Sequence, residues 1–268
     1  MSASYFMTDL VADTLSSEVD LDWNDAVLYI PYHMQALLYE YADCLAVRTL
    51  LRMAKLPIRL EERPNVEFMS PTGKVPFLQM HSFLIPEFQP VVDFLAKHNI
   101  KLSAGLTDIQ RADMYAHMSL FDEILRNIEI YMMWIDKRNY SQVTRYRYGS
   151  VYLWPLNTIL PWMKRREMSS YLAALEWKNK SQESIIDLAD RCFKSISSKL
   201  EHKHFHYLSY FFGTTPTELD ALTFGHLYTI LTTELPNMEL KNCLRRYSNL
   251  TEFCQRIDKL YFTPETNE

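Results

Sequence analysis

SPTGKVPFLQM, at residues 70–80, is the stretch that decides the fold of this chain of 268 residues. Pro71, Gly73 and Pro76 interrupt regular structure, and no helix runs through Pro76, because proline lacks a backbone N–H and clashes with the preceding turn. The apolar residues after Pro76 therefore predict a short strand that begins at a tight X-Pro turn, of a kind that can be cis. Such a turn either shapes the fold alone or also holds a ligand.

Extended and helical segments alternate around this turn. AVLYI, at 26–30, is a short apolar run typical of a buried strand, and DCLAVRTLLRMAKL, at 43–56, repeats apolar residues with helical spacing. Further strands are predicted in IRLEER at 58–63, VPFLQM at 75–80 and HSFLIPE at 81–87, before a helix that begins near Pro90. A strand-helix-strand unit favours parallel pairing and the last two strands form a hairpin. This is the arrangement of a thioredoxin-like domain.

Beyond residue 106 the pattern changes to long helices only. Thr217 and Asp220 have the spacing of an N-cap residue and its partner at N3, so they are predicted to cap one of these helices. The other helices are predicted over about 107–137, 157–178 and 181–200, and from Asn249 onwards. The chain is therefore predicted to consist of a flexible N-terminal segment at 1–24, a thioredoxin-like α/β domain at 25–100 and an all-helical domain at 107–262.

Composition argues against several functions. The net charge of -5 and the pI of about 5.9 disfavour a broad nucleic-acid-binding surface, and Lys164-Arg165-Arg166 is interpreted as a solvated helix face. Five glycines and no G-x-G-x-x-G or Walker-type lysine loop disfavour a phosphate-binding loop. No apolar run reaches the roughly 18 residues of a transmembrane helix. The scattered cysteines predict reduced thiols in a cytosolic setting, and the acidic start of the chain resembles no signal or matrix-targeting peptide.

The predicted architecture carries a family resemblance. A thioredoxin-like half with Pro76 before its third strand, followed by a helical half capped at Thr217 and Asp220, resembles the glutathione transferase superfamily. Within that superfamily the chain resembles the metaxin family over nearly its whole length beyond residue 25. The stretches that carry this resemblance are EFMSPTGKVPFL at 67–78, RYGSVYLWPLN at 147–157, PTELDALTFGHLYTILTTEL at 216–235 and YSNLTEFCQRI at 247–257.

The resemblance implies a non-catalytic role without a cofactor. Metaxins are subunits of the sorting and assembly machinery of the mitochondrial outer membrane, which inserts β-barrel proteins. For this chain the resemblance implies a peripheral position on the cytosolic face of that membrane. The implied partners are a membrane-anchored metaxin and the core protein of β-barrel assembly. The family also implies a link to motor adaptors that move mitochondria along microtubules.

A glutathione-dependent transferase is the alternative function. Its site needs a strand edge beside the proline turn, a hydroxyl at a helix N-terminus for the γ-glutamyl carboxylate, and a donor that lowers the pKa of the thiol. Val75-Pro76 supplies the first, but the superfamily's acid-then-serine pair looks here like Glu87-Phe88, which has no hydroxyl. Among the candidate thiol-activating residues, a packing or surface role is favoured for Tyr32, Tyr39 and Tyr41, and a buried structural thiol is favoured for Cys44. Pro76 is therefore interpreted mainly as a structural residue.

Other chemistry-bearing residues favour structural roles as well. The H-x-H-x-H run at 202–206 would place three imidazoles on one face of an extended segment, but a solvated loop is favoured over a metal site. His226 is predicted to be packed in a helix. Glu218 and Asp220 look like paired carboxylates, yet helix capping explains Asp220 without acid-base catalysis. No catalytic, cofactor-binding or metal-binding residue is predicted.

One segment has the composition of an interface. RYRYGSVYLWPLN, at 145–157, combines arginine with tyrosine and tryptophan, the residue types enriched in binding hot spots. Tyr148, Tyr152 and Trp154 are therefore predicted to dock the partner metaxin. A loop packed back on its own helices is the equally weighted alternative.

Overall fold

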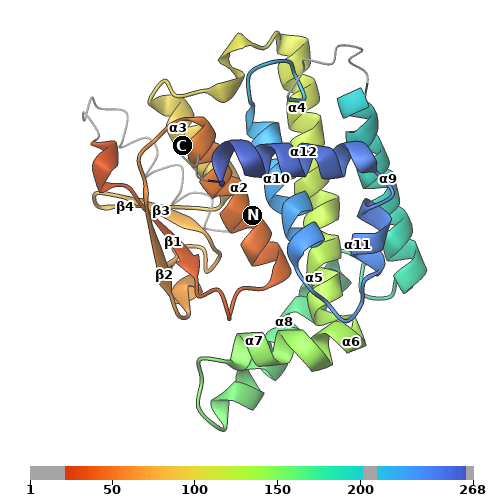
Figure 1. The fold of residues 1–268 in the computed structure, drawn as a ribbon. Coiled ribbons are helices and arrows are strands. Elements are labelled where there is room, and N and C mark those ends of the chain that lie inside the picture. The colour runs from red at the N-terminus through yellow and green to blue at the C-terminus, as the bar shows by residue number, and fades with distance from the viewer. Residues whose placement is uncertain (1–21, 202–209, 264–268) are drawn as a thin grey trace.

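The computed structural model describes residues 22–201 and 210–263, which form a small mixed sheet beside a large group of helices (Figure 1). Its four strands are β1 (Val27–Pro31), β2 (Arg59–Arg63), β3 (Phe77–Met80) and β4 (Phe83–Pro86), in the order β2-β1-β3-β4. β1 pairs in parallel with β2 and antiparallel with β3, and β3 and β4 form the hairpin. The predicted thioredoxin-like arrangement of these strands is confirmed.

The helices of the first half differ from the prediction at their start. Helix α2 (Leu38–Met53) begins ahead of the predicted segment, because the carboxylate of Glu40 accepts the backbone N–H of Leu37 at 3.0 Å and so satisfies a donor of the first turn. The helix also ends before the last residues of the predicted segment, and Ala54 is its C-cap. The remaining elements of this half are the short 3-10 turns η1 (Trp23–Asp25), η2 (Val66–Met69) and η3 (Leu102–Gly105), and helix α3 (Phe88–Lys97).

The second half of the chain is helical, as predicted. The helix expected over 107–137 is α4 (Asp108–Leu120), a π-helical turn at Phe121–Leu125 and α5 (Arg126–Trp134). The segment at 145–157, for which a packed loop is the alternative to an interface, is partly helical and contains α7 and the start of α8. The other helices are α6 (Lys137–Asn139), α7 (Arg145–Gly149, after a π-helical turn at Tyr140–Thr144), α8 (Leu156–Ala174), α9 (Gln182–Glu201), α10 (Glu218–Thr232), α11 (Glu239–Leu244) and α12 (Ser248–Tyr261).

The start of helix α10 contains Thr217, its N-cap, and Asp220, two of the residues that are predicted to be structural. The Asp220 carboxylate accepts the backbone N–H and hydroxyl of Thr217 at 2.8 and 2.6 Å, and the N–H of Phe211 at 2.9 Å. The neighbouring Glu218 accepts the backbone N–H and hydroxyl of Ser103 at 3.3 and 3.2 Å. The start of α10 therefore holds both the preceding turn and the segment that joins the two halves.

The two halves share one large hydrophobic core, and a second, small cluster in the sheet half consists of Cys44, Val66, Val75 and Phe77. The division into domains at residues 101–106 stays a proposal, and residues 1–21 of the predicted flexible segment lie outside the described residues. At the centre of the shared core α2 lies directly against α10 (Figure 1). A Cβ atom added at Gly225 would lie 2.6 Å from the carbonyl oxygen of Ala42 and 2.6 Å from the Cβ of Ala46. Only glycine allows the two backbones to come this close.

We expect Gly225→Ala to destabilise the chain, although alanine in a helix interior normally gains about 1 kcal/mol over glycine. The added methyl group would meet backbone atoms of α2, which cannot rotate away, so the free energy of unfolding should fall by about 2 kcal/mol. Urea unfolding followed by circular dichroism measures this loss. Gly105→Ala is the matched control, because no atom lies within 4 Å of the added methyl group. An equal effect of the two substitutions would contradict the proposed close packing.

Candidate functional site

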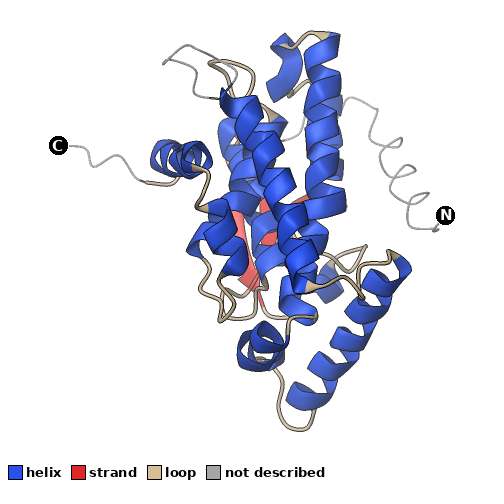
Figure 2. Cartoon of the chain, turned by 90° about the vertical axis from the view of Figure 1, so that its right-hand side faces the viewer, coloured by secondary structure: helices blue, strands red, loops and turns tan. Residues whose placement is uncertain are grey.

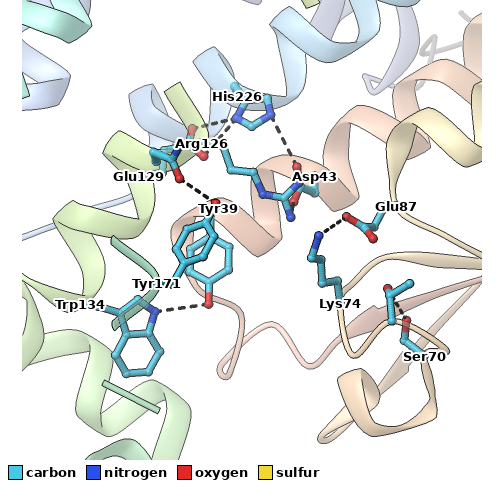
Figure 3. Close-up of polar contacts among 12 residues, drawn as sticks. Tyr39, Asp43, Ser70, Lys74, Glu87, Arg126, Glu129, Trp134, Tyr171 and His226 are labelled. Atoms are coloured by element: carbon cyan, nitrogen blue, oxygen red, sulfur yellow. Dashed lines mark hydrogen bonds and ion pairs between the residues drawn. The ribbon is translucent and has the colours of Figure 1, made fainter. Parts of the chain in front are cut away.

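A cleft opens between the turn at Pro76 and helices α5 and α8. Figure 3 labels Lys74, Arg126 and Tyr171 among the residues that line it. The Val75–Pro76 peptide bond is cis, and the Pro76 carbonyl accepts the backbone N–H of Glu87 at 2.9 Å. A cavity of about 450 Å³ and a neighbouring one of about 410 Å³ meet in this cleft. Both are lined by Thr72, Lys74, Arg126 and Tyr171. The cleft is therefore large enough for a small ligand.

The cations of the cleft are already paired with carboxylates of the chain itself. Lys74 Nζ lies 2.6 Å from Glu87 Oε2, and Arg126 Nη2 lies 2.8 Å from Asp43 Oδ2. The Tyr171 hydroxyl donates a hydrogen bond of 3.1 Å to the Asn127 side chain. Lys164, which also lines the cleft, lies 2.8 Å from Glu167 Oε1. An anionic ligand would have to compete with these carboxylates for the three cations.

The helix start that faces this cleft has no hydroxyl. Phe88 is the first residue of α3, and its ring is only 7% exposed. Glu87 precedes it with a φ of 66° and makes no side-chain bond to the first turn of the helix. The position where the superfamily places a serine is thus filled by an aromatic ring that packs into the core.

The candidate donors for a thiol are also badly placed. Tyr39 lines the cleft, but it is buried, its hydroxyl accepts the indole N–H of Trp134 at 3.3 Å, and burial raises its pKa well above the usual value. Burial likewise raises the pKa of the half-buried Tyr41 and of Cys44, which is packed in the core. Tyr32 is 49% exposed on the surface. Stabilising a thiolate needs a group that donates readily, so none of these four side chains is suited to it.

A group of buried charges lies behind the cleft and joins α2, α5 and α10 (Figure 3). His226 Nδ1 lies 2.9 Å from Glu129 Oε1, and its Nε2 lies 3.6 Å from Asp43 Oδ1. Burial alone would lower the pKa of His226, but the charge and hydrogen bond of Glu129, together with the charge of Asp43, raise it. Burial raises the pKa of Asp43 to about 6, against the opposing charges of Arg126 and His226.

Sequence reasoning identified only part of these two sites. It placed His226 in the packed interior but did not single out Arg126 or Glu129. The available signal was two charged residues inside the apolar run ILRNIEIYMMW at 124–134. A charge on the buried side of a helix needs a partner, but the sequence does not say which one.

The predicted interface residues point in different directions. Tyr148 is half-buried, packs edge-on against Trp134 with ring centroids 5.5 Å apart, and lines the cleft. Tyr152 is half-buried, and its hydroxyl is buried without a hydrogen-bond partner. Trp154 is 82% exposed at the turn between α7 and α8. Of the three, only Trp154 presents a largely exposed ring.

Metal and disulfide chemistry find no support in the part of the chain that the structure describes. Within residues 22–201 and 210–263, no group of three or more His, Cys, Asp or Glu side chains could hold a metal ion. The H-x-H-x-H run at 202–206 lies outside the described residues. Cys44, Cys192, Cys243 and Cys254 are free thiols in the interior.

The sheet, the cis-proline turn and the helical second half together define a glutathione-transferase-like fold. Glutathione transferases of Ceriporiopsis subvermispora and Phanerochaete chrysosporium superpose with a TM-score of 0.59. The first is 14% identical and covers 90% of this chain and 99% of its own; the second is 15% identical and covers 91% and 100%. The family profile for the C-terminal domain of glutathione S-transferase matches residues 189–257.

Comparison with related sequences identifies the family to which the chain belongs within this class of fold. The metaxin-2 homolog of Caenorhabditis elegans is 42% identical over 87% of this chain and 99% of its own length, and human metaxin-2 is 42% identical over 85% of each. Mouse metaxin-1 is 32% identical over 84% of this chain and 72% of its own length. A profile described as outer mitochondrial membrane transport complex protein matches residues 44–165. The chain belongs to the metaxin family. Within the family, the sequence blocks quoted above predict a stronger resemblance to metaxin 2, and the identities of 42% to metaxin-2 proteins against 32% to mouse metaxin-1 confirm it.

We expect His226→Gln to lower the free energy of unfolding by about 3 kcal/mol near pH 6.5, because it removes the charged partner of the buried Glu129. Glutamine keeps the size and a hydrogen-bond donor but cannot carry the charge.

The pH dependence of stability should change as well. Because the folded state raises the pKa of His226, its contribution is present below the ordinary histidine pKa of about 6.5 and is lost as the pH rises through the raised value. Folding also raises the pKa of Asp43, so its contribution to stability likewise falls as the pH rises. This loss occurs at lower pH, between the ordinary pKa of 3.8 and the raised value of about 6. Urea titrations from pH 6 to 9 should therefore show a decline in the unmodified chain that is reduced in His226→Gln. Parallel pH profiles would show that folding does not raise the pKa of His226, and would contradict this account.

Proposed function

We propose that this chain is a non-catalytic subunit of the sorting and assembly machinery of the mitochondrial outer membrane, acting in protein import and β-barrel insertion. The observation that carries the proposal is the 42% identity to metaxin-2 proteins over nearly the whole chain. The match to an outer mitochondrial membrane transport complex profile supports the same location.

The geometry of the cleft supports the absence of catalysis. Phe88 stands where the superfamily's hydroxyl would hold a glutathione carboxylate, and Tyr39 has a pKa shifted in the wrong direction to activate a thiol. A glutathione transferase would need both functions at this position. The residues of the cleft and the sequence relatives therefore outweigh the glutathione-transferase-like fold in assigning a function to this chain.

The proposed partners follow from the family. They are a membrane-anchored metaxin and the core protein of β-barrel assembly, with motor adaptors as a further link. The proposed position is peripheral, on the cytosolic face of the outer membrane. Among the described residues, the structure contains no helix that is both long and apolar enough to cross a bilayer.

Partner docking by Tyr148, Tyr152 and Trp154 stays a prediction. The first two side chains are half-buried and would act by shaping the segment that they belong to. Trp154 is the one whose ring would meet another molecule, so its surroundings bear on whether that molecule is a protein or a lipid.

We expect the full chain to sediment with mitochondrial membranes and to be released by alkaline carbonate, which strips peripheral but not membrane-spanning proteins. Solubilised in mild detergent, the tagged chain should retain a second metaxin and the β-barrel assembly core in near-stoichiometric amounts. Mass spectrometry of the captured complex measures the amounts of these two partners. Recovery of the chain alone, or in the soluble fraction, would contradict the proposal.

A further inference from the structure

The hairpin formed by α7 and α8 carries an apolar surface that no described part of the chain covers. Leu153 and Trp154, at the turn between the two helices, are 87% and 82% exposed. The apolar surface continues along the first half of α8. Its main residues are Leu153, Trp154, Leu156, Ile159, Trp162 and Met163, and we call them the apolar tip.

The spacing along α8 places these side chains on one side of the helix. Leu156, Ile159 and Met163 follow one another at three and four residues, which is the repeat of a single helical face. In both views the hairpin forms the lower end of the molecule, away from α4 (Figures 1 and 2). The apolar tip therefore faces outward at one end of the structure.

Contacts on the inner side hold the hairpin in this position. A Cβ atom at Gly149 would lie 2.6 Å from the carbonyl oxygen of Asn157, so α7 and α8 touch backbone to backbone. Arg165 Nε donates to the carbonyl of Trp134 at 3.0 Å, and its guanidinium lies 3.9 Å from the centre of the Tyr140 ring. The apolar tip is thus presented by a fixed element rather than by a loose loop.

The charge around the apolar tip is mainly positive. Residues 137–166 contain seven lysines and arginines and no aspartate or glutamate, although the chain as a whole has a net charge of -5. Arg147 and Arg165 bond inward to backbone carbonyls. Lys137, Arg138, Arg145 and Arg166 are exposed. Glu167, the next residue along α8, is exposed and lies 2.8 Å from Lys164 Nζ. The exposed apolar surface is therefore bordered mainly by positive charge.

We infer that the apolar tip of the α7–α8 hairpin lies in the surface of an anionic phospholipid bilayer. Tryptophan favours the boundary between headgroups and acyl chains, and a helix with one apolar face lies in that plane. Exposed lysines and arginines beside such a face bind lipid phosphates. A bilayer surface of negative charge thus complements both features. This gives the chain a lipid contact of its own, beyond the contacts with protein partners in the proposed complex.

The test uses the purified full chain and vesicles of phosphatidylcholine, with or without phosphatidylglycerol. We expect the chain to co-sediment with the anionic vesicles only, less so at high salt, and its tryptophan fluorescence to shift to shorter wavelength on binding. The double variant Leu153→Ser, Trp154→Ser should lose at least about tenfold in affinity, because its two most exposed apolar side chains are gone. Unchanged circular dichroism and thermal midpoint show that this variant is folded.

Two further variants separate the apolar and the electrostatic contributions. Ile109→Ser is the matched control, because Ile109 is 84% exposed on α4, at the other end of the molecule, and its loss should leave binding unchanged. Arg145→Gln and Arg166→Gln should each weaken binding to anionic vesicles about fivefold and reduce the salt dependence.

Equal binding to both kinds of vesicle, no binding to either, or full binding by the Leu153→Ser, Trp154→Ser variant would overturn the inference. If the unmodified chain fails to bind vesicles and the double variant fails to capture the second metaxin, the apolar tip docks a protein instead. Because the vesicles contain no protein, a failure to capture partners alongside normal vesicle binding would count against the proposed function and leave this inference intact.

Discussion

The contact between α2 and α10 at Gly225 is the constraint on which the rest of this structure depends. α2 belongs to the sheet half and α10 to the helical half, so the orientation of the two halves is set where their backbones meet. The same contact brings His226 of α10 close to Asp43 of α2, and Glu129 of α5 pairs with the same imidazole. Such charges cost free energy unless each finds its partner, so they allow few other ways of packing the two halves. Gly225 and the alanines opposite it allow α2 and α10 to pack closely, and the buried charges favour this one arrangement of the two helices.

This packing also creates the cleft, and it does so without providing a glutathione site. The cis proline turn is retained as part of the sheet, while Phe88 and Glu87 occupy the positions around it with an aromatic ring and an internal ion pair. A fold can keep its framework after the groups that bind and activate a ligand are gone, because packing and chemistry rest on different residues. In the proposed role, the surface of the molecule carries the function and the cleft is a consequence of the fold.

The sequence predicted the features that depend on local patterns. Pro76, the short apolar runs and the N-terminal signals at Thr217 led to the strands, the hairpin and the helical half, and the fold class was confirmed. It did not predict the pairing of His226 with Glu129, which lie 97 residues apart, because spacing along a chain does not show which buried charges meet. The helix α7 that contains Tyr148 was not predicted either, for a related reason. The ring of Tyr148 packs against Trp134, and tertiary contacts override local propensity.

Titration calorimetry of the purified full chain with glutathione tests most directly whether this fold serves here as a scaffold without its ligand. The loss of the hydroxyl at residue 88, and the engagement of Lys74 and Arg126 with the chain's own carboxylates, predict no saturable heat and a dissociation constant weaker than about 1 mM. A saturable binding curve with a dissociation constant of about 10 µM, which corresponds to nearly 7 kcal/mol, would contradict the account. It would show that the cleft still binds glutathione.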